Sequence, residues 1–100
     1  MTLLAHFFAG VFLVNGIPHF VHGVSGKSFQ SPFARPPGVG KSSSIVNVLW
    51  GLFNFIIGYV LLFCVGSFNL APKLDTLITA IGGFITAIIL SWHFQRVRKE

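Results

Sequence analysis

Three long runs of apolar residues alternate with short polar stretches along this chain. The apolar runs cover about residues 2–21, 45–66 and 74–94. Each run comes close to the roughly 20 residues that an α-helix needs to cross the hydrocarbon core of a bilayer. A loop rich in Gly, Pro and Ser, about residues 23–43, separates the first two runs, and Ser67–Lys73 connects the last two. The pattern predicts one all-α transmembrane domain, an integral membrane bundle of three helices.

The basic residues lie mainly on one side of these runs, and this bias predicts an orientation. Six of the seven Lys and Arg residues are in the first loop or after the third run: Lys27, Arg35, Lys41, Arg96, Arg98 and Lys99. Basic residues near membrane spans stay on the cytoplasmic side. We therefore expect a multi-pass protein of the bacterial inner membrane, with its N-terminus outside and its first loop and C-terminus in the cytoplasm.

The composition argues against a soluble protein. Hydrophobic residues make up 53% of the chain and charged residues 9%, whereas soluble domains have roughly 25% charged residues. The net charge of +5 comes from residues that flank the spans, whereas a nucleic-acid-binding protein gathers its basic residues on one face. We therefore expect the lipid bilayer as partner and no nucleic acid. Lys27, Arg35 and Lys41 are expected to contact anionic headgroups or other anions, at about 1 kcal/mol for each cation.

The first loop has two interpretations, because it carries Phe29 and Phe33 among several prolines. An unstructured connection of this length is unusual in a compact chain. In one interpretation the loop lies on the lipid headgroups, with both phenylalanines dipped into the membrane. In the other, the loop forms a cap over a pocket that faces the cytoplasm.

Each predicted span has one face of small or polar residues. Residues three, four and seven apart share a helix face. The residues expected at helix interfaces or along a pore are small or carry an amide or a hydroxyl group: Asn15, Asn47, Gly51, Asn54, Gly58, Thr79, Gly82 and Thr86. Membrane helices associate through small residues and interhelical hydrogen bonds. We therefore expect helix packing, with Asn15 and Asn54 bonded across an interface, and a hydrated path is the alternative.

These stripes predict a function in assembly more readily than in permeation. Three helices pack together without a lumen, so a channel needs several copies of the chain. Because the charge bias gives one orientation, a homo-oligomer should be parallel and cyclic. We expect a small non-catalytic membrane protein, either an oligomer or an accessory subunit of a membrane complex. The alternative is a homo-oligomeric channel or transporter for ions or small solutes, lined by Asn54, Thr79 and Thr86.

Three of the four histidines are predicted to lie at one depth. His19 and His22 come near the cytoplasmic end of the first span and His93 near that of the third, whereas His6 is at the opposite end. Imidazole is a ligand of transition metals and of haem iron. No cofactor is the first expectation, because interfacial histidines also bond to headgroups, water or loop carbonyls. Binding of haem or a transition metal through His19, His22 and His93 is a further alternative.

Catalysis is not expected, because acidic residues are scarce and no Ser/His/Asp or Cys/His combination is plausible. Asp75 and Glu100 are the only carboxylate side chains, and Cys64 is the only cysteine. Proton-coupled transporters commonly use acids at membrane depth, and none is present there. Residues 35–42 resemble the nucleotide-binding phosphate loop, with Arg35 in place of its first glycine, but no strand precedes them. We therefore expect neither an enzyme nor a nucleotide site.

The first span resembles a known family near its end. The segment Phe12–Phe20 closes with Asn-Gly-Ile-Pro-His-Phe. It resembles the first helix of DoxX-like small bacterial membrane proteins, which often ends in a glycine followed by His-Phe. The resemblance implies a partner subunit in the inner membrane, near redox enzymes. It singles out His19 and Phe20 without giving either residue a role.

Overall fold

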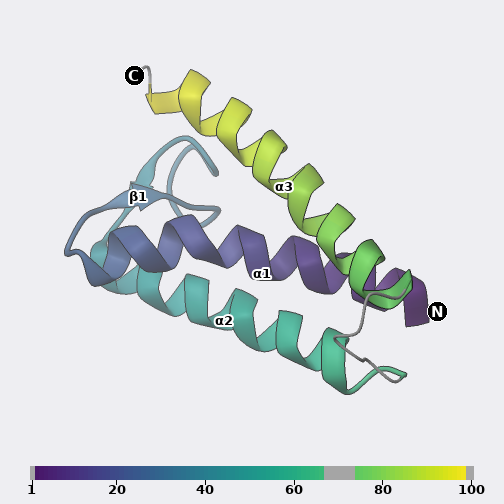
Figure 1. Ribbon diagram of the computed structural model, residues 1–100. Helices are drawn as coiled ribbons and strands as arrows, with labels where there is room; N and C mark the ends of the chain where they lie inside the picture. Colours follow the sequence, from purple (N-terminus) through teal and green to yellow (C-terminus); the bar gives the residue numbers. More distant parts are fainter. Residues whose placement is uncertain (1, 67–73, 99–100) are drawn as a thin grey trace.

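The computed structural model describes residues 2–66 and 74–98, and most of these residues are helical (Figure 1). The helices are α1 (Thr2–Val24), α2 (Ser44–Phe63) and α3 (Leu74–Arg98). All three are long and apolar enough to cross a membrane. The three predicted spans are therefore confirmed as helices. The predicted connection Ser67–Lys73, like Lys99 and Glu100, lies outside the described residues.

The helices differ from the predicted spans mainly at their C-terminal ends. α1 and α3 continue to Val24 and Arg98, past residues 21 and 94, and α2 ends at Phe63, before residue 66. α2 begins after Ser43, whose hydroxyl accepts a hydrogen bond of 3.3 Å from the Val46 N–H. This bond satisfies one of the donors that a helix start leaves unpaired.

α1 lies in the middle of the molecule and packs against both other helices, which contact each other little. α2 runs antiparallel beside α1 (Figure 1). α3 instead crosses α1 near the point where both helices begin, and then diverges from it toward the C-terminus (Figure 1). The two ends of the molecule are therefore built differently. We call the end where α1 and α3 begin the N-terminal end, and the opposite end the loop end.

Glycines allow α1 to approach both neighbours closely. A Cβ atom at Gly51 would lie 2.8 Å from the backbone N of Phe20, and one at Gly82 would collide with the carbonyl oxygen of Phe7. Small residues permit such backbone contact between membrane helices. The buried residues of α2 are Asn47, Gly51, Asn54, Gly58 and Leu62. The polar and small stripe predicted for the second span is therefore a buried face of that helix.

The loop between α1 and α2 has a small structure of its own. Strands β1 (Phe29–Gln30) and β2 (Lys41–Ser42) pair antiparallel, with Phe29 opposite Ser42. This pairing brings together the two halves of the connection and adds a short β element to the otherwise all-α fold. The expectation that no strand precedes residues 35–42 is therefore wrong, because β1 does. The loop lies near the C-terminal half of α3 (Figure 1), and His93 of α3 is hydrogen-bonded to the carbonyl oxygen of Gly38 in the loop.

Phe29 and Phe33 have different surroundings, although both are in this loop. Phe29 is 3% exposed, and its ring packs against those of His19 and Phe94, at centroid distances of 5.4 and 4.7 Å. Phe33 is 64% exposed. The interpretation in which both phenylalanines dip into the membrane is therefore wrong for Phe29. The loop covers the end of the bundle, as in the cap interpretation.

Candidate functional site

A cavity of about 280 Å³ lies at the loop end, lined by residues of all three helices and of the loop. The lining residues are Asn15, His19, Gln30, Ser31, Pro32, Gly38, Trp50, Leu90, His93 and Phe94. Ligand pockets combine apolar walls with a few polar groups that orient the ligand, and typically exceed about 300 Å³. The cavity has this mixed lining, and its size suits a small chemical group.

One wall of the cavity is fixed by a buried network around Asn47. The Asn47 Nδ2 donates to the carbonyl oxygens of Phe29, Ser42 and Ser43, at 3.1, 3.2 and 3.0 Å. These bonds set the amide orientation, so Oδ1 is the acceptor for His19 Nδ1 at 2.9 Å. The Nδ1 of His19 therefore carries a proton, and in the neutral imidazole its Nε2 is an acceptor.

A second wall contains a donor without a partner. The Nε1–H of Trp50 is buried and has no hydrogen-bond partner among the described residues. A buried donor of this kind carries a desolvation penalty of about 1–3 kcal/mol. Its neighbour Asn54 is fully paired, because Nδ2 donates to the Trp50 carbonyl oxygen and Oδ1 accepts from Asn15 Nδ2. The predicted bond between Asn15 and Asn54 is confirmed, at 2.9 Å.

The loop is attached to α3 across the cavity. The His93 Nε2–H donates to the Gly38 carbonyl oxygen at 2.8 Å. The Arg98 guanidinium donates to Gln30 Oε1 at 3.1 Å, and also lies over the ring of Phe29. These contacts join residues far apart in the sequence. They keep the loop and the end of α3 together, at the end of the molecule where sequence analysis grouped the basic residues.

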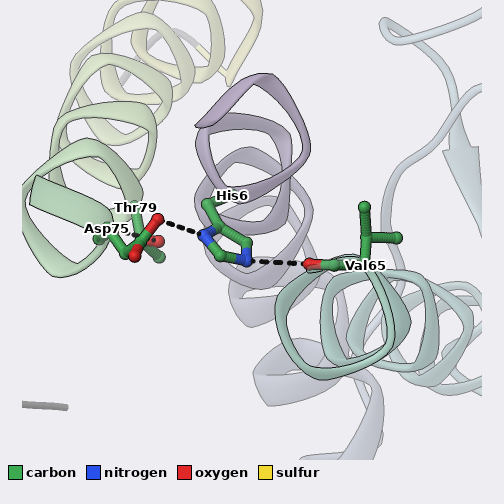
Figure 2. A network of polar contacts seen from close by, with 4 residues as sticks. All are labelled: His6, Val65, Asp75 and Thr79. Carbon is green, nitrogen blue, oxygen red and sulfur yellow. Dashed lines mark hydrogen bonds and ion pairs between the residues drawn. The ribbon is translucent and has the colours of Figure 1, made fainter. Parts of the chain in front are cut away.

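The N-terminal end contains a different polar group, centred on His6 (Figure 2). The His6 ring is fully buried. Its Nδ1 lies 2.9 Å from Asp75 Oδ1 and its Nε2 lies 3.2 Å from the Val65 carbonyl oxygen. A carbonyl and an ionised carboxylate only accept hydrogen bonds, and a neutral imidazole has one N–H. The Nε2–H therefore donates to the Val65 carbonyl oxygen, and the Nδ1 contact joins either an imidazolium to the Asp75 carboxylate or a neutral imidazole to the protonated carboxyl group. Thr79 adds a hydroxyl bond to the Asp75 carbonyl oxygen at 2.9 Å.

The pairing of His6 with Asp75 was missed by the sequence analysis, which placed His6 at the end opposite to the other histidines and did not connect it with Asp75. The two residues are 69 positions apart. α1 and α3 begin at the same end of the molecule (Figure 1). Residues near the start of one helix therefore lie at the same depth as residues near the start of the other. The signal that could have found the pair was a histidine near the start of the first apolar run and an acid at the start of the third.

The residues predicted at helix interfaces are mostly buried between helices. Asn47, Gly51, Asn54 and Gly58 are buried on α2, and Gly82 and Thr86 on α3. Thr79 lies beside Gly10 of α1, where a Cβ atom would collide with the Thr79 carbonyl oxygen. The hydroxyl of Thr86 donates to the Gly82 carbonyl oxygen at 2.8 Å. These polar groups are therefore used within the chain, and a path for solutes lined by Asn54, Thr79 and Thr86 stays a prediction.

The three histidines proposed for a metal have separate surroundings. His19 and His93 line the same cavity, but His22 does not. The His22 ring stacks on Phe29 at 4.2 Å, and its Nδ1 lies 2.9 Å from the Pro18 carbonyl oxygen. Within residues 2–66 and 74–98, no group of three or more His, Cys, Asp or Glu side chains is placed to hold a metal ion. Binding of haem or metal by the three histidines stays a prediction without a matching geometry.

The cations proposed for lipid or anion contact are all at the surface. Lys27, Arg35 and Lys41 are exposed and belong to the loop. They are therefore accessible to headgroups at the loop end, and this contact stays a prediction.

The chain was compared with known proteins at three levels. No family model, no curated protein and no solved structure matches it. The resemblance of the first helix to DoxX-like proteins therefore stays a prediction. The function of the chain has to be argued from its own geometry.

Proposed function

We propose that this chain is a non-catalytic, multi-pass protein of the bacterial inner membrane that works as a parallel homo-oligomer or as an accessory subunit. Its N-terminus lies outside in this proposal, with the loop end and its basic residues in the cytoplasm. The three apolar helices support a membrane location.

The observation that carries the assembly proposal is a shallow groove on the outer face of α3. The groove has a volume of about 380 Å³ and is lined by Phe84, Ala87, Ile88, Ser91, Trp92 and Gln95. Ala87 and Ser91 are one helical turn apart, and small residues at this spacing allow a second membrane helix to approach closely. Gln95 offers an amide at the edge of the groove, which can bond to a neighbouring helix. A surface that faced lipid alone would need neither feature.

In this proposal the glycines of α2 pack against α1 within one chain and do not mediate assembly. Gly51 and Gly58 already contact α1 within one chain. Substitution of either residue should therefore unfold the single chain, and it is unsuited to testing assembly. The groove on α3 is the surface to test.

The experiment measures the mass of the protein in detergent and in lipid nanodiscs by light scattering. The wild type should be an oligomer, and Ala87→Leu should shift it toward the monomer because the larger side chain fills the groove. Ile89→Phe is the matched control, since it adds bulk to an exposed position of the same helix outside the groove. A monomeric wild type, or an equal effect of both variants, would contradict self-association. Reporter fusions after residue 30 and at the C-terminus test the orientation.

A further inference from the structure

We propose that the cavity at the loop end binds the neutral, hydroxyl-bearing head of a membrane amphiphile. This inference depends on the membrane location proposed above, but not on the oligomeric state. It assigns a ligand class to the cavity lined by His19, Trp50 and His93.

The first step is to identify two polar atoms in the cavity wall that have no hydrogen-bond partner among the described residues. Trp50 provides a buried N–H that has no partner within residues 2–66 and 74–98. His19 provides Nε2, for which no partner is found among the described residues, whereas its Nδ1 is held by Asn47. The two rings are 6.3 Å apart between centroids, at 70° to each other. Both residues line the same cavity, so a small group that enters it lies beside both side chains.

The second step is the chemistry that satisfies both atoms. The Trp50 N–H needs an acceptor, and the Nε2 of a neutral His19 needs a donor. A hydroxyl group supplies both at once, because its oxygen accepts and its hydrogen is donated. A carbonyl or an ether only accepts, and satisfies Trp50 alone. The wall therefore favours an alcohol or a phenol.

The third step is the charge of the head. The residues that line the cavity include no Lys, Arg, Asp or Glu. A buried charge without a partner is strongly disfavoured, so the head should be neutral. Leu90, Phe94 and Pro32 give the remaining walls an apolar surface, which suits the carbon atoms that carry the hydroxyl group.

The fourth step is the place for an apolar tail. A groove of about 510 Å³ is lined by Phe33, Val46, Leu49, Trp50 and Phe53. Trp50 lines both the groove and the cavity, and Pro32 of the cavity precedes Phe33 of the groove. The groove is almost entirely apolar, so a hydrocarbon chain can lie there while the hydroxyl group reaches the cavity. Together the two spaces suit an amphiphile.

The test follows the indole N–H signal of Trp50 by NMR in dodecylphosphocholine micelles, whose headgroup has no hydroxyl. The protein carries Trp92→Phe, so that the isotope-labelled indole of Trp50 gives the single signal. The probes are 1-dodecanol, dodecyl methyl ether and dodecane. Dodecanol should shift the signal downfield and saturably, because the N–H gains an acceptor. The ether should bind about tenfold more weakly, because it cannot donate to His19. Dodecane should give no saturable shift.

Two controls keep the outcome decisive. In Trp50→Phe protein the exposed Trp92 indole should show no saturable shift, which excludes general partition into the micelle. His19→Phe should remove the preference for alcohol over ether. Absence of a saturable shift with dodecanol, which leaves the cavity to water only, would overturn the proposal. Equal binding of alcohol and ether to the protein with His19 intact, or of dodecanol and dodecane, would also overturn it. None of these readouts depends on the oligomeric mass.

Discussion

α1 and α3 are in close contact at one end of this molecule and apart at the other. At the N-terminal end, α1 and α3 meet through glycine backbone, with Gly10 against Thr79 and Gly82 against Phe7. At the loop end the helices diverge (Figure 1), and aromatic side chains and the loop fill part of the space between them. Close contact is therefore confined to the positions where both helices have small residues.

The difference extends to the polar groups. His6 has an oxygen atom within hydrogen-bond distance of each ring nitrogen (Figure 2). In the cavity at the loop end, by contrast, the Trp50 N–H is buried without a partner among the described residues. A fully paired polar group stabilises a fold, whereas an unpaired buried one destabilises it and commonly marks a functional or solvated place. The comparison indicates that the N-terminal end holds the helices together and the loop end can bind a ligand.

The largest expected effect comes from removing the close contact at the N-terminal end. Gly82→Leu places a side chain where the Phe7 carbonyl oxygen lies, so the helices must separate. We expect a loss of more than about 2 kcal/mol in the free energy of unfolding, as for overpacked cores. Equilibrium unfolding in mixed micelles measures this loss. Ala80→Leu, at an exposed position of the same helix outside the groove, is the control, and an equal loss there would refute the role of the contact.

The second prediction concerns the network that attaches the loop. Asn47→Leu removes three bonds to carbonyl oxygens and the partner of His19. At about 1 kcal/mol or less for each neutral bond, we expect a loss of about 2–3 kcal/mol. Amide hydrogen exchange should rise in residues 25–43 and stay unchanged near His6. An equal increase in exchange along the whole chain would show that the two ends unfold together. That result would contradict the proposed difference between the two ends.

The third prediction concerns the pair of His6 and Asp75 at the N-terminal end. His6→Phe keeps a ring of similar size but leaves the Asp75 carboxylate and the Val65 carbonyl oxygen without this donor. Polar contacts between membrane helices contribute about 0.6–1.7 kcal/mol, and we expect a loss in this range or slightly above. A double-mutant cycle with Asp75→Asn isolates the pair. Coupling energy near zero would mean that the pair contributes nothing to stability.

The smallest effect is expected at the cavity. Trp50→Phe removes an N–H that has no partner among the described residues. The smaller ring loses packing area, which destabilises the fold, but the desolvation penalty of the N–H is also lost, which offsets this effect. We expect the free energy of unfolding to change by less than about 1 kcal/mol. Tyr59→Phe, which removes a polar hydrogen at an exposed position outside the cavity and both grooves, serves as the control. A large loss specific to Trp50 would mean that its N–H is bonded in the folded protein.

Much of the fold follows from the pattern of residues alone. The three apolar runs form helices, because a backbone in the hydrocarbon core of a membrane must satisfy its own hydrogen bonds. The spacing of Asn47, Gly51, Asn54 and Gly58 on one face identified the buried stripe of α2. These features depend on residues within one helix, and sequence spacing describes them directly.

Other features were decided only by the tertiary structure. The cavity joins His19, Trp50 and His93 from three helices, and the loop that contributes to its lining also buries Phe29. The pairing of His6 with Asp75 likewise depends on where α1 crosses α3. A helical period fixes the face on which a side chain lies, but not which face of another helix it meets. That choice depends on the crossing point of α1 and α3, which is set by contacts such as Gly10 with Thr79 between distant parts of the chain.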